Sequence, residues 1–477
     1  MSQTAASFLP NSSPIVTFRL LFLTGAAYDP KGKEGVAALT AAMLANGGSR
    51  RMSYEQVLQA LYPMAAHFSA QVDKEMTVFH GSTHIDNLQS YYQIIAEMLL
   101  EPGWREDDFT RVKEDAINFL RVNLRRNNDE ELGKEALYNY IYEGHPYGHH
   151  NVGTVESLQK LTLDDVKEFY RANFTLDNFI LGLAGGYPAD FAARVQEDFA
   201  GKLGAGEPSR IELPPPAEFS GLRMQIIQKQ TRGTAISFGF PISVTRAHPD
   251  WPALLVAQSY FGQHRSNNSY ITQRMRQIRG LNYGNYAYIE YFPRGMYQFH
   301  PDPNLGRRQQ IFQVWIRPVE PRNGLFALRI ALYELRKFVA NGLSPEDFEA
   351  TRRFLSKFIN VLTKTQDAQL GYALDSRYYG IPEFHEYVRN SLAGLTVEDV
   401  NRVIREQLQA DNVKIVVVTE DAEAFRKAAI ENAPSPIAYA TAMPPEVLEE
   451  DKAIEKYPLN FSPEAIVVVP VEEVFER

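Results

Sequence analysis

The segment Gly25-Ala-Ala-Tyr-Asp-Pro-Lys-Gly-Lys-Glu-Gly-Val-Ala-Ala-Leu-Thr-Ala-Ala-Met-Leu-Ala-Asn-Gly-Gly48 divides into a turn and a helix. Asp29-Pro30 and the glycines around it predict the turn. The alanine-rich run that follows predicts a helix over 36–45, because alanine has the highest helix propensity. Asn46 and Gly47 then come where a left-handed residue commonly ends a helix.

The chemistry of this helix is defined by three alanines on or near one face. Residues three and four apart are neighbours on a helix, so Ala38, Ala41 and Ala42 come together there. Methyl groups bind no metal and transfer no proton. The helix therefore has no catalytic group on that face.

The residues around these alanines resemble the zinc-binding helix of the pitrilysin/insulinase zinc peptidases, the inverzincins. The pattern of that family runs Gly-Ser-x-x-Asp-Pro-x-Gly-x-x-Gly-Leu-Ala-His-Leu-x-Glu-His-Met-Leu. The chain shares with it Gly25, Asp29, Pro30, Gly32, Gly35, Ala37, Leu39, Met43 and Leu44. The two histidine ligands of the pattern fall on Ala38 and Ala42, and the general-base glutamate falls on Ala41. The resemblance implies a family member whose own catalytic centre has been lost.

The third zinc ligand of the family is a glutamate on a later helix, which precedes a His-Pro-Tyr-Gly turn. Gly144-His-Pro-Tyr-Gly148 matches that turn. Counting back without gaps places the ligand position at Arg121, to within about one turn of helix. A guanidinium does not coordinate zinc. The neighbouring residues are not carboxylates either: Asn118, Phe119, Val122 and Asn123. We therefore expect no catalytic residue, metal or other cofactor in this chain.

A long internal repeat predicts two homologous domains. Residues 161–181 recur as residues 395–415, at an offset of 234 residues, and each copy reads as a capped helix, an Asp-Asn turn and a strand. A period of this length indicates duplicated domains, not a solenoid. The expected fold class is α+β, with a mostly antiparallel sheet and helices on one face of each domain. The resemblance adds that the two domains form half or all of a clamshell.

Composition sets the predicted boundaries. Glycine and proline are frequent between the halves, which predicts domains at 1–203 and 222–429 joined by a linker at 204–221. The Pro-rich, acidic tail at 430–477 is expected to be an extension that carries one short strand.

Charge and composition exclude several protein classes. The 477 residues carry a net charge of −9, which argues against nucleic-acid binding. No apolar run is long enough to span a membrane, and the absence of cysteine excludes disulfides and thiolate metal sites. Relatives usually have a strand before the one expected at 15–23. We therefore expect a mature chain without its leader and first strand, located in the periplasm, or a cytoplasmic protein if the N-terminus is complete.

The second half keeps a pair of residues that the family uses for substrate. Arg274-Met-Arg-Gln-Ile-Arg-Gly-Leu-Asn-Tyr283 resembles the family run Leu-Arg-x-x-x-Gly-Leu-x-Tyr. The resemblance implies that Arg276 and Tyr283 contact the peptide backbone or the scissile carbonyl, where donors stabilise developing negative charge. The alternative is an ordinary solvated arginine and a tyrosine packed in the core.

Two further segments bear on binding. An edge strand near 66–79 corresponds to the strand on which the family binds its peptide by β-augmentation. Residues 263–268, Gln-His-Arg-Ser-Asn-Asn, replace a glycine-rich loop of the family. The histidines are interpreted as surface or turn residues: His67, His80, His145, His149 and His150.

These observations favour a non-catalytic subunit of a heteromeric zinc peptidase. Its partner would be a homologous subunit with an intact H-x-x-E-H helix and the zinc, as the resemblance to the inactive chain of mitochondrial processing peptidase and of two-chain bacterial peptidases implies. The alternative is a catalytically silent scaffold or peptide-binding protein of the same fold. A third possibility is an active peptidase with unrecognised ligands.

Overall fold

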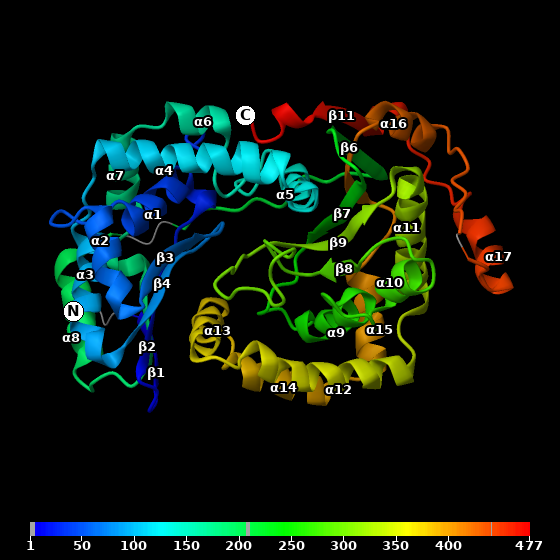
Figure 1. Ribbon diagram of the computed structural model, residues 1–477. Coiled ribbons are helices and arrows are strands. Elements are labelled where there is room, and N and C mark those ends of the chain that lie inside the picture. The colour runs from blue at the N-terminus through cyan, green and yellow to red at the C-terminus, as the bar shows by residue number, and fades with distance from the viewer. Residues whose placement is uncertain (1–4, 207–209, 440) are drawn as a thin grey trace.

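The computed structural model describes residues 5–206, 210–439 and 441–477. It consists of two halves, each built on one β-sheet with helices packed against it (Figure 1). The α+β class and the two-domain architecture predicted from the sequence are therefore confirmed. Part of the expected linker, residues 207–209, lies outside the described residues.

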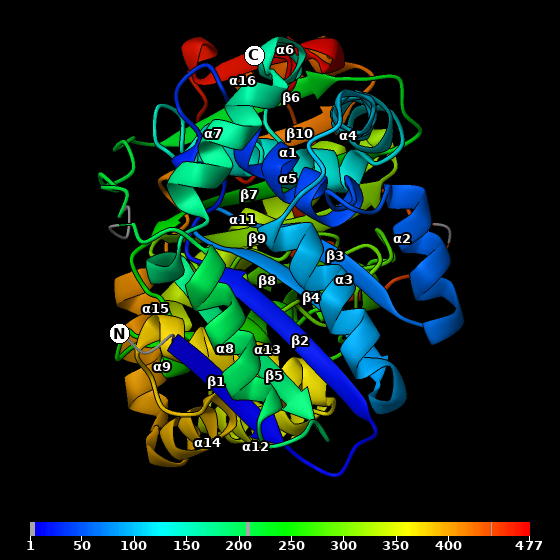
Figure 2. The same cartoon turned by 90° about the vertical axis from the view of Figure 1, so that its left-hand side faces the viewer.

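The sheet of the N-terminal half has five strands in the order β1-β5-β2-β4-β3 (Figure 2). Neighbouring strands are antiparallel, except that β1 and β5 are parallel. The strands are β1 (Ala5–Pro10), β2 (Ile15–Phe22), β3 (His67–Val72), β4 (Thr77–His84) and β5 (Phe179–Gly185). This order leaves β3 at the edge of the sheet.

Two expectations from the sequence are wrong. A strand does precede β2, because β1 pairs with β5 along its whole length from Ala5 to Pro10. The helix cap is also displaced by one residue. Gly47 has φ −102°, and the left-handed residue is Gly48, at φ +68°. A Cβ on Gly48 would lie 2.5 Å from the Met52 carbonyl oxygen, so both space and φ require glycine there.

The sheet of the C-terminal half repeats this arrangement and adds one strand. Its order is β11-β6-β10-β7-β9-β8. Within it, the five strands β6-β10-β7-β9-β8 correspond in order to β1-β5-β2-β4-β3 of the N-terminal sheet. The additional strand β11 comes from the C-terminal extension and runs parallel to β6. The strands are β6 (Leu222–Gln228), β7 (Thr234–Ile242), β8 (Asn285–Tyr288), β9 (Gln310–Val319), β10 (Val413–Thr419) and β11 (Ile466–Pro470).

Helices surround both sheets (Figure 1). Those of the N-terminal half are α1 (Val36–Asn46), α2 (Tyr54–Leu61), α3 (Leu88–Leu100), α4 (Glu106–Asn118), α5 (Asp129–Ile141), α6 (Val155–Lys160), α7 (Leu163–Asn173) and α8 (Phe191–Lys202). Those of the C-terminal half are α9 (Trp251–Gly262), α10 (Tyr270–Thr272), α11 (Gly324–Asn341), α12 (Pro345–Leu362), α13 (Gln366–Tyr379), α14 (Phe384–Gly394), α15 (Val397–Gln407) and α16 (Ala422–Ile430). The extension carries α17 (Pro445–Ile454).

The two halves exchange a pair of corresponding helices. Helix α5 packs on β7 and β10 of the C-terminal sheet, and α13 packs on β1, β2 and β5 of the N-terminal sheet. Leu132 of α5 lies in one core cluster with Val416 and Val418, while Leu374 of α13 is buried with Leu21 and other N-terminal residues. Each half therefore completes the core of the other.

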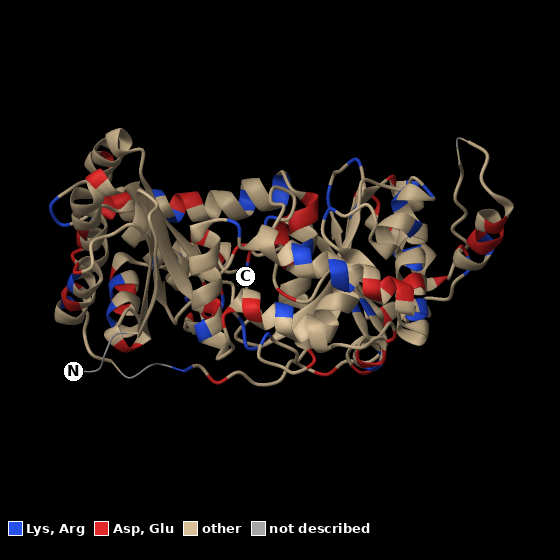
Figure 3. Ribbon diagram, turned by 90° about the horizontal axis from the view of Figure 1, so that it is seen from below, with Lys and Arg blue, Asp and Glu red and all other residues tan. Residues whose placement is uncertain are grey.

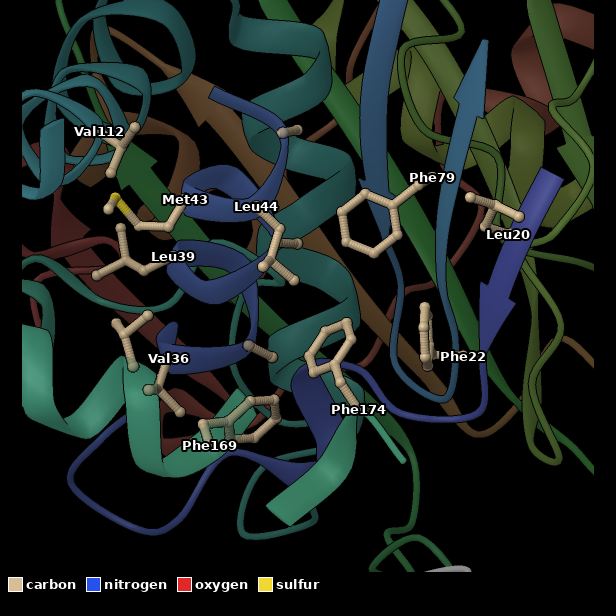
Figure 4. Packing of buried hydrophobic residues seen from close by; sticks show 14 of the residues in the cluster. Leu20, Phe22, Val36, Leu39, Met43, Leu44, Phe79, Val112, Phe169 and Phe174 are labelled. Carbon is tan, nitrogen blue, oxygen red and sulfur yellow. The ribbon is translucent and has the colours of Figure 1, made fainter. Parts of the chain in front are cut away.

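Helix α1 is held between other helices and the N-terminal sheet (Figure 4). Leu39 and Met43 are directed towards Val112 of α4, and Leu44 is directed towards the aromatic rings of the sheet. All of these side chains are buried in one cluster. Small residues on a helix permit such close packing. The alanine-rich composition thus makes α1 a core helix.

The outer surface carries charges of both signs, and Figure 3 shows them interspersed along both halves. Over the described parts of the chain, no helix is both long and apolar enough to cross a membrane.

Candidate functional site

Asp29 fixes the start of α1. Its two carboxylate oxygens accept hydrogen bonds from the backbone N–H groups of Gly35 (2.6 Å) and Ala37 (2.8 Å). A negative charge at a helix N-terminus is favourable, because the unpaired N–H groups and the helix dipole meet it there. His149 Nε2 lies 3.1 Å from the same carboxylate. The Asp-Pro part of the motif therefore positions the helix, a task that does not depend on zinc.

The three alanines of α1 do not fit a metal. Ala41 is completely buried, and Ala38 and Ala42 are half-buried. Zinc requires imidazole, thiolate or carboxylate ligands, and methyl groups supply none. Across residues 5–206, 210–439 and 441–477, no group of three or more His, Cys, Asp or Glu side chains could hold a metal ion.

Arg121 lies on a π-helix, Phe119–Arg126, which continues α4. Its side chain is exposed and forms an ion pair with Glu476 at 3.4 Å. Phe119, two residues earlier, reaches the central cavity described below, and its ring lies 5.8 Å from that of His150. The assignment of Arg121 to the position of the third ligand stays a prediction, and the π-helix, with more residues per turn than an α-helix, changes which side chains of this segment share a face.

A cavity of about 780 Å³ lies between the two halves. Its N-terminal wall consists of β3, the π-helix and α5. Its C-terminal wall consists of α13 and the loop 289–309, which joins β8 to β9. The lining residues include Arg19, Ser69, Ala70, His80, Glu135, His150, Tyr291, Arg294, Asp302 and Asp367.

Strand β3 presents an unpaired edge to this cavity. In an antiparallel ladder, alternate residues bond the partner strand and the others point away from it. The bond from Asp73 N–H to the Met76 carbonyl fixes this alternation, so the backbone groups of Phe68, Ala70 and Val72 point away from β4. The Val72 carbonyl accepts a bond from the Asn151 side chain at 3.3 Å. In the described structure, the outward groups of Phe68 and Ala70 have no such partner.

Ion pairs join the two halves around the cavity. Arg19 of β2 donates from Nε and Nη2 to Asp367 of α13, at 2.9 and 2.7 Å. Arg307 of the loop donates to both oxygens of Asp73, at 2.8 and 2.5 Å, and both side chains are buried. The Arg307 guanidinium also lies 3.8 Å from the centre of the Tyr291 ring. Such bidentate pairs fix one geometry, so the cavity wall is held rigidly.

Burial shifts the titration of the groups along this wall. Glu135 is buried and lies near Glu131, and this raises the pKa of the Glu135 carboxyl to about 7. Its Oε1 accepts a hydrogen bond from the Tyr291 hydroxyl at 2.8 Å. Burial beside Lys74 lowers the pKa of His150 to about 3, so this imidazole is neutral at pH 7. Of the surface and turn positions expected for the histidines, His145 and His150 occupy turn positions, and both are buried there.

Arg276 and Tyr283 lie outside the central cavity. Arg276 Nη1 donates to Asn267 Oδ1 at 2.8 Å, and Tyr283 is 76% exposed. The exposure of Tyr283 argues against packing in the core. The neighbouring arginines are bound by the extension instead. Arg279 is buried and bonds Asp451 of α17, while Arg274 bonds Glu450 of α17 and also donates from Nε to Glu334 Oε1 of α11 at 2.6 Å.

The loop 289–309 is the part of the cavity that the sequence did not reveal. It contains Pro293, Gly295, Pro301, Pro303 and Gly306, a composition typical of an exposed connection. Its adjacent aromatic residues Tyr291 and Phe292 are buried, and this aromatic pair was the signal that the first part of the loop packs inside. None of the six residues singled out in the sequence lines the cavity: Ala38, Ala41, Ala42, Arg121, Arg276 and Tyr283.

Two family models match the chain. Residues 7–155 match the model described as insulinase (peptidase family M16), and residues 160–355 match the one described as the peptidase M16 inactive domain. Together they cover well over half of the sequence.

Curated relatives include proteins with and without a peptidase designation. An "Uncharacterized zinc protease" of Rickettsia bellii is 22% identical over 395 residues, covering 81% of this chain and 89% of the relative. The "Non-peptidase homolog YmxG" of Helicobacter pylori is 20% identical, covering 85% of this chain and 89% of the relative. The beta subunit of the mitochondrial-processing peptidase of Caenorhabditis elegans is 21% identical, covering 55% and 58%.

Solved structures share the fold. The peptidase M16 inactive domain of Pseudomonas fluorescens superposes with a TM-score of 0.76 at 21% identity, covering 88% of this chain and 96% of that one.

Proposed function

Because this chain belongs to the insulinase-like peptidase family M16, we propose that it is a non-catalytic subunit that binds peptide beside a zinc-bearing homologue. The observation that carries the proposal is the unpaired edge of β3 in the central cavity, next to a helix whose ligand positions are alanines. The family membership and the inactive-type domain are established by the comparisons. The partner and the bound peptide are our inference.

An extended peptide would bind to the edge of β3. The outward N–H and C=O groups of Phe68 and Ala70 would pair with its backbone, as in β-augmentation. Ser69 Oγ and His80 Nε2 lie 3.2 Å apart on the adjoining strands, and they would offer polar contacts to the peptide side chains. Backbone pairing of this kind gives affinity without strong sequence preference.

Hydrolysis would take place on the partner. A zinc ion held there would lower the pKa of its bound water to about 7. In this chain, Tyr283 is exposed and Arg276 is half-buried, so both donors would face a second subunit or a peptide lying between the subunits. They would donate hydrogen bonds to the carbonyl oxygen of the peptide.

The test combines the purified chain with the H-x-x-E-H homologue encoded by the same genome. We expect no peptide hydrolysis by this chain alone and zinc-dependent hydrolysis by the pair. Arg276→Ala should lower kcat/KM of the pair by about tenfold, since a charged hydrogen bond contributes roughly 1.5–3 kcal/mol. Arg353→Ala, on the exposed side of α12, is the matched control. An unchanged rate for Arg276→Ala would remove Arg276 from the substrate site.

The second candidate function is a catalytically silent scaffold or peptide-holding protein of the same fold. The ion pairs that lock the two halves together favour it, because they suit a rigid structural part. If every pairing lacks hydrolysis while the chain still forms a stable complex, this candidate replaces the first.

A further inference from the structure

A second hollow lies inside the C-terminal half, separate from the central cavity. It has a volume of about 110 Å³ and lies between α9, α12, α14 and the loop 289–309. We call it the aromatic pocket. Its walls are mainly the rings of Trp251, Tyr288, Phe292, Phe299, Phe358 and Phe384.

The walls of the aromatic pocket are fixed by strong interactions. Arg246 donates to both oxygens of Glu290, at 2.9 and 2.8 Å, and to Asp375 at 3.0 Å. Trp251 Nε1 donates to Glu290 at 3.1 Å. The Phe384 ring stacks on Tyr372, with centroids 4.3 Å apart. Arg246, Glu290 and Trp251 thus bond one another, so these polar groups do not need a partner inside the pocket.

The rim of the aromatic pocket is exposed. Phe299 has 65% of its surface exposed. The Arg265 guanidinium carbon lies 4.4 Å from the centre of the Phe299 ring, in a cation–π contact. Phe358 stacks on Phe354, itself 42% exposed, with centroids 5.1 Å apart. Exposed aromatic residues around a preformed apolar hollow are characteristic of binding sites.

The loop 289–309 is the partition between the aromatic pocket and the central cavity. Tyr291 lines both spaces. Phe299 and Pro301 line the pocket, whereas Arg294 and Asp302 line the cavity. The two hollows therefore lie side by side, with Tyr291 and the loop 289–309 as their common wall.

The geometry points to the aromatic pocket as a subsite that receives one large apolar side chain of a peptide lying in the central cavity. This inference rests on the proposed peptide-binding role of the cavity. A dry cavity of about 150 Å³ holds benzene, so the smaller pocket of about 110 Å³ suits an aliphatic side chain such as valine, leucine, isoleucine or methionine. The subsite therefore selects peptides by one apolar residue, in addition to the backbone pairing along β3.

The test uses a tryptic digest of casein as the probe. The full-length chain is mixed with the digest, retained peptides are separated by ultrafiltration, and both fractions are sequenced by mass spectrometry. We expect retained peptides to be enriched in large apolar residues, with Leu→Ala in a retained synthetic peptide weakening binding by about tenfold or more. Val388→Phe, which places a ring in the pocket, should abolish this preference while peptides remain bound.

Phe299→Ala provides a second variant that cannot disturb the core, because the ring is mostly exposed. It should weaken the same preference. Tyr62→Ala, which removes an aromatic ring that is 87% exposed on the N-terminal half, is the control and should change nothing. If the wild type retains no peptide, the proposed peptide binding of the cavity fails. If peptides bind but their apolar preference is absent or survives in both variants, the cavity role stands and the subsite is refuted.

Discussion

Replacing Arg307 by methionine would leave a buried carboxylate without its partner. Arg307 belongs to the loop 289–309, and Asp73 ends the edge strand β3, so this ion pair joins the two halves. The side chains are 2% and 0% exposed. Methionine preserves most of the apolar stem, which isolates the loss of charge from the loss of packing.

The expected cost follows from the surroundings of Asp73. Breaking a buried ion pair by removing one partner costs roughly 3–5 kcal/mol. Two neighbouring groups reduce the cost of leaving the Asp73 carboxylate without Arg307. Asn151 donates to Asp73 at 2.9 Å, and Lys74 follows it in the chain. Burial and the nearby Arg307 lower the pKa of Lys74 to about 7, so removing Arg307 lets Lys74 hold its proton more firmly. We therefore expect Arg307→Met to lower the free energy of unfolding by about 3 kcal/mol, the lower end of this range.

Urea unfolding at pH 7 measures this cost, with circular dichroism and tryptophan fluorescence as independent probes. The double variant Asp73→Asn, Arg307→Met should recover to within about 1 kcal/mol of the wild type, because no charge is then left unpaired. A loss of unfolding free energy below about 1 kcal/mol for Arg307→Met would refute the reasoning. So would a loss in the double variant that equals the sum of the losses in the two single variants.

Two other predictions concern pH and metal. The folded-state pKa of Glu135, about 7, lies above its unfolded value, so the folded chain binds more protons between pH 4.5 and 7. Relative to Glu135→Gln, the wild type should therefore lose about 3 kcal/mol of stability as pH rises from 4.5 to 8, and parallel unfolding curves against pH would contradict this. In an Ala38→His, Ala42→His background, Phe119→Glu should raise zinc affinity in isothermal calorimetry by about tenfold or more, whereas Arg121→Glu should not. The reverse order would show that Arg121 is the counterpart of the third ligand.

The sequence was sufficient for the fold class, because the internal repeat and the zinc-helix frame can both be recognised without knowing any contact in the structure. The helix α1 and the strand β2 follow directly from alanine propensity and from alternating apolar residues. The strand β1 was missed, since its six residues have no flanking repeat to mark them. Its pairing with β5 is a contact between distant residues, which local pattern does not encode.

The candidate site was less accessible to sequence reasoning. The absence of ligands on α1 could be read from three positions. The π-helix Phe119–Arg126 could not, because the change in helical period appears only in the backbone. The central cavity depends on ion pairs between residues more than 200 positions apart, such as Asp73 and Arg307. Nothing in either segment alone marks the other as its partner.

The exchange of α5 and α13 makes the molecule an internal domain swap. A single ancestral repeat with this geometry would fold only as a pair, lending one helix to its neighbour and receiving the equivalent one. The two halves are thus one cooperative folding unit, and a protease cut in the connection after α8 should leave the fragments associated.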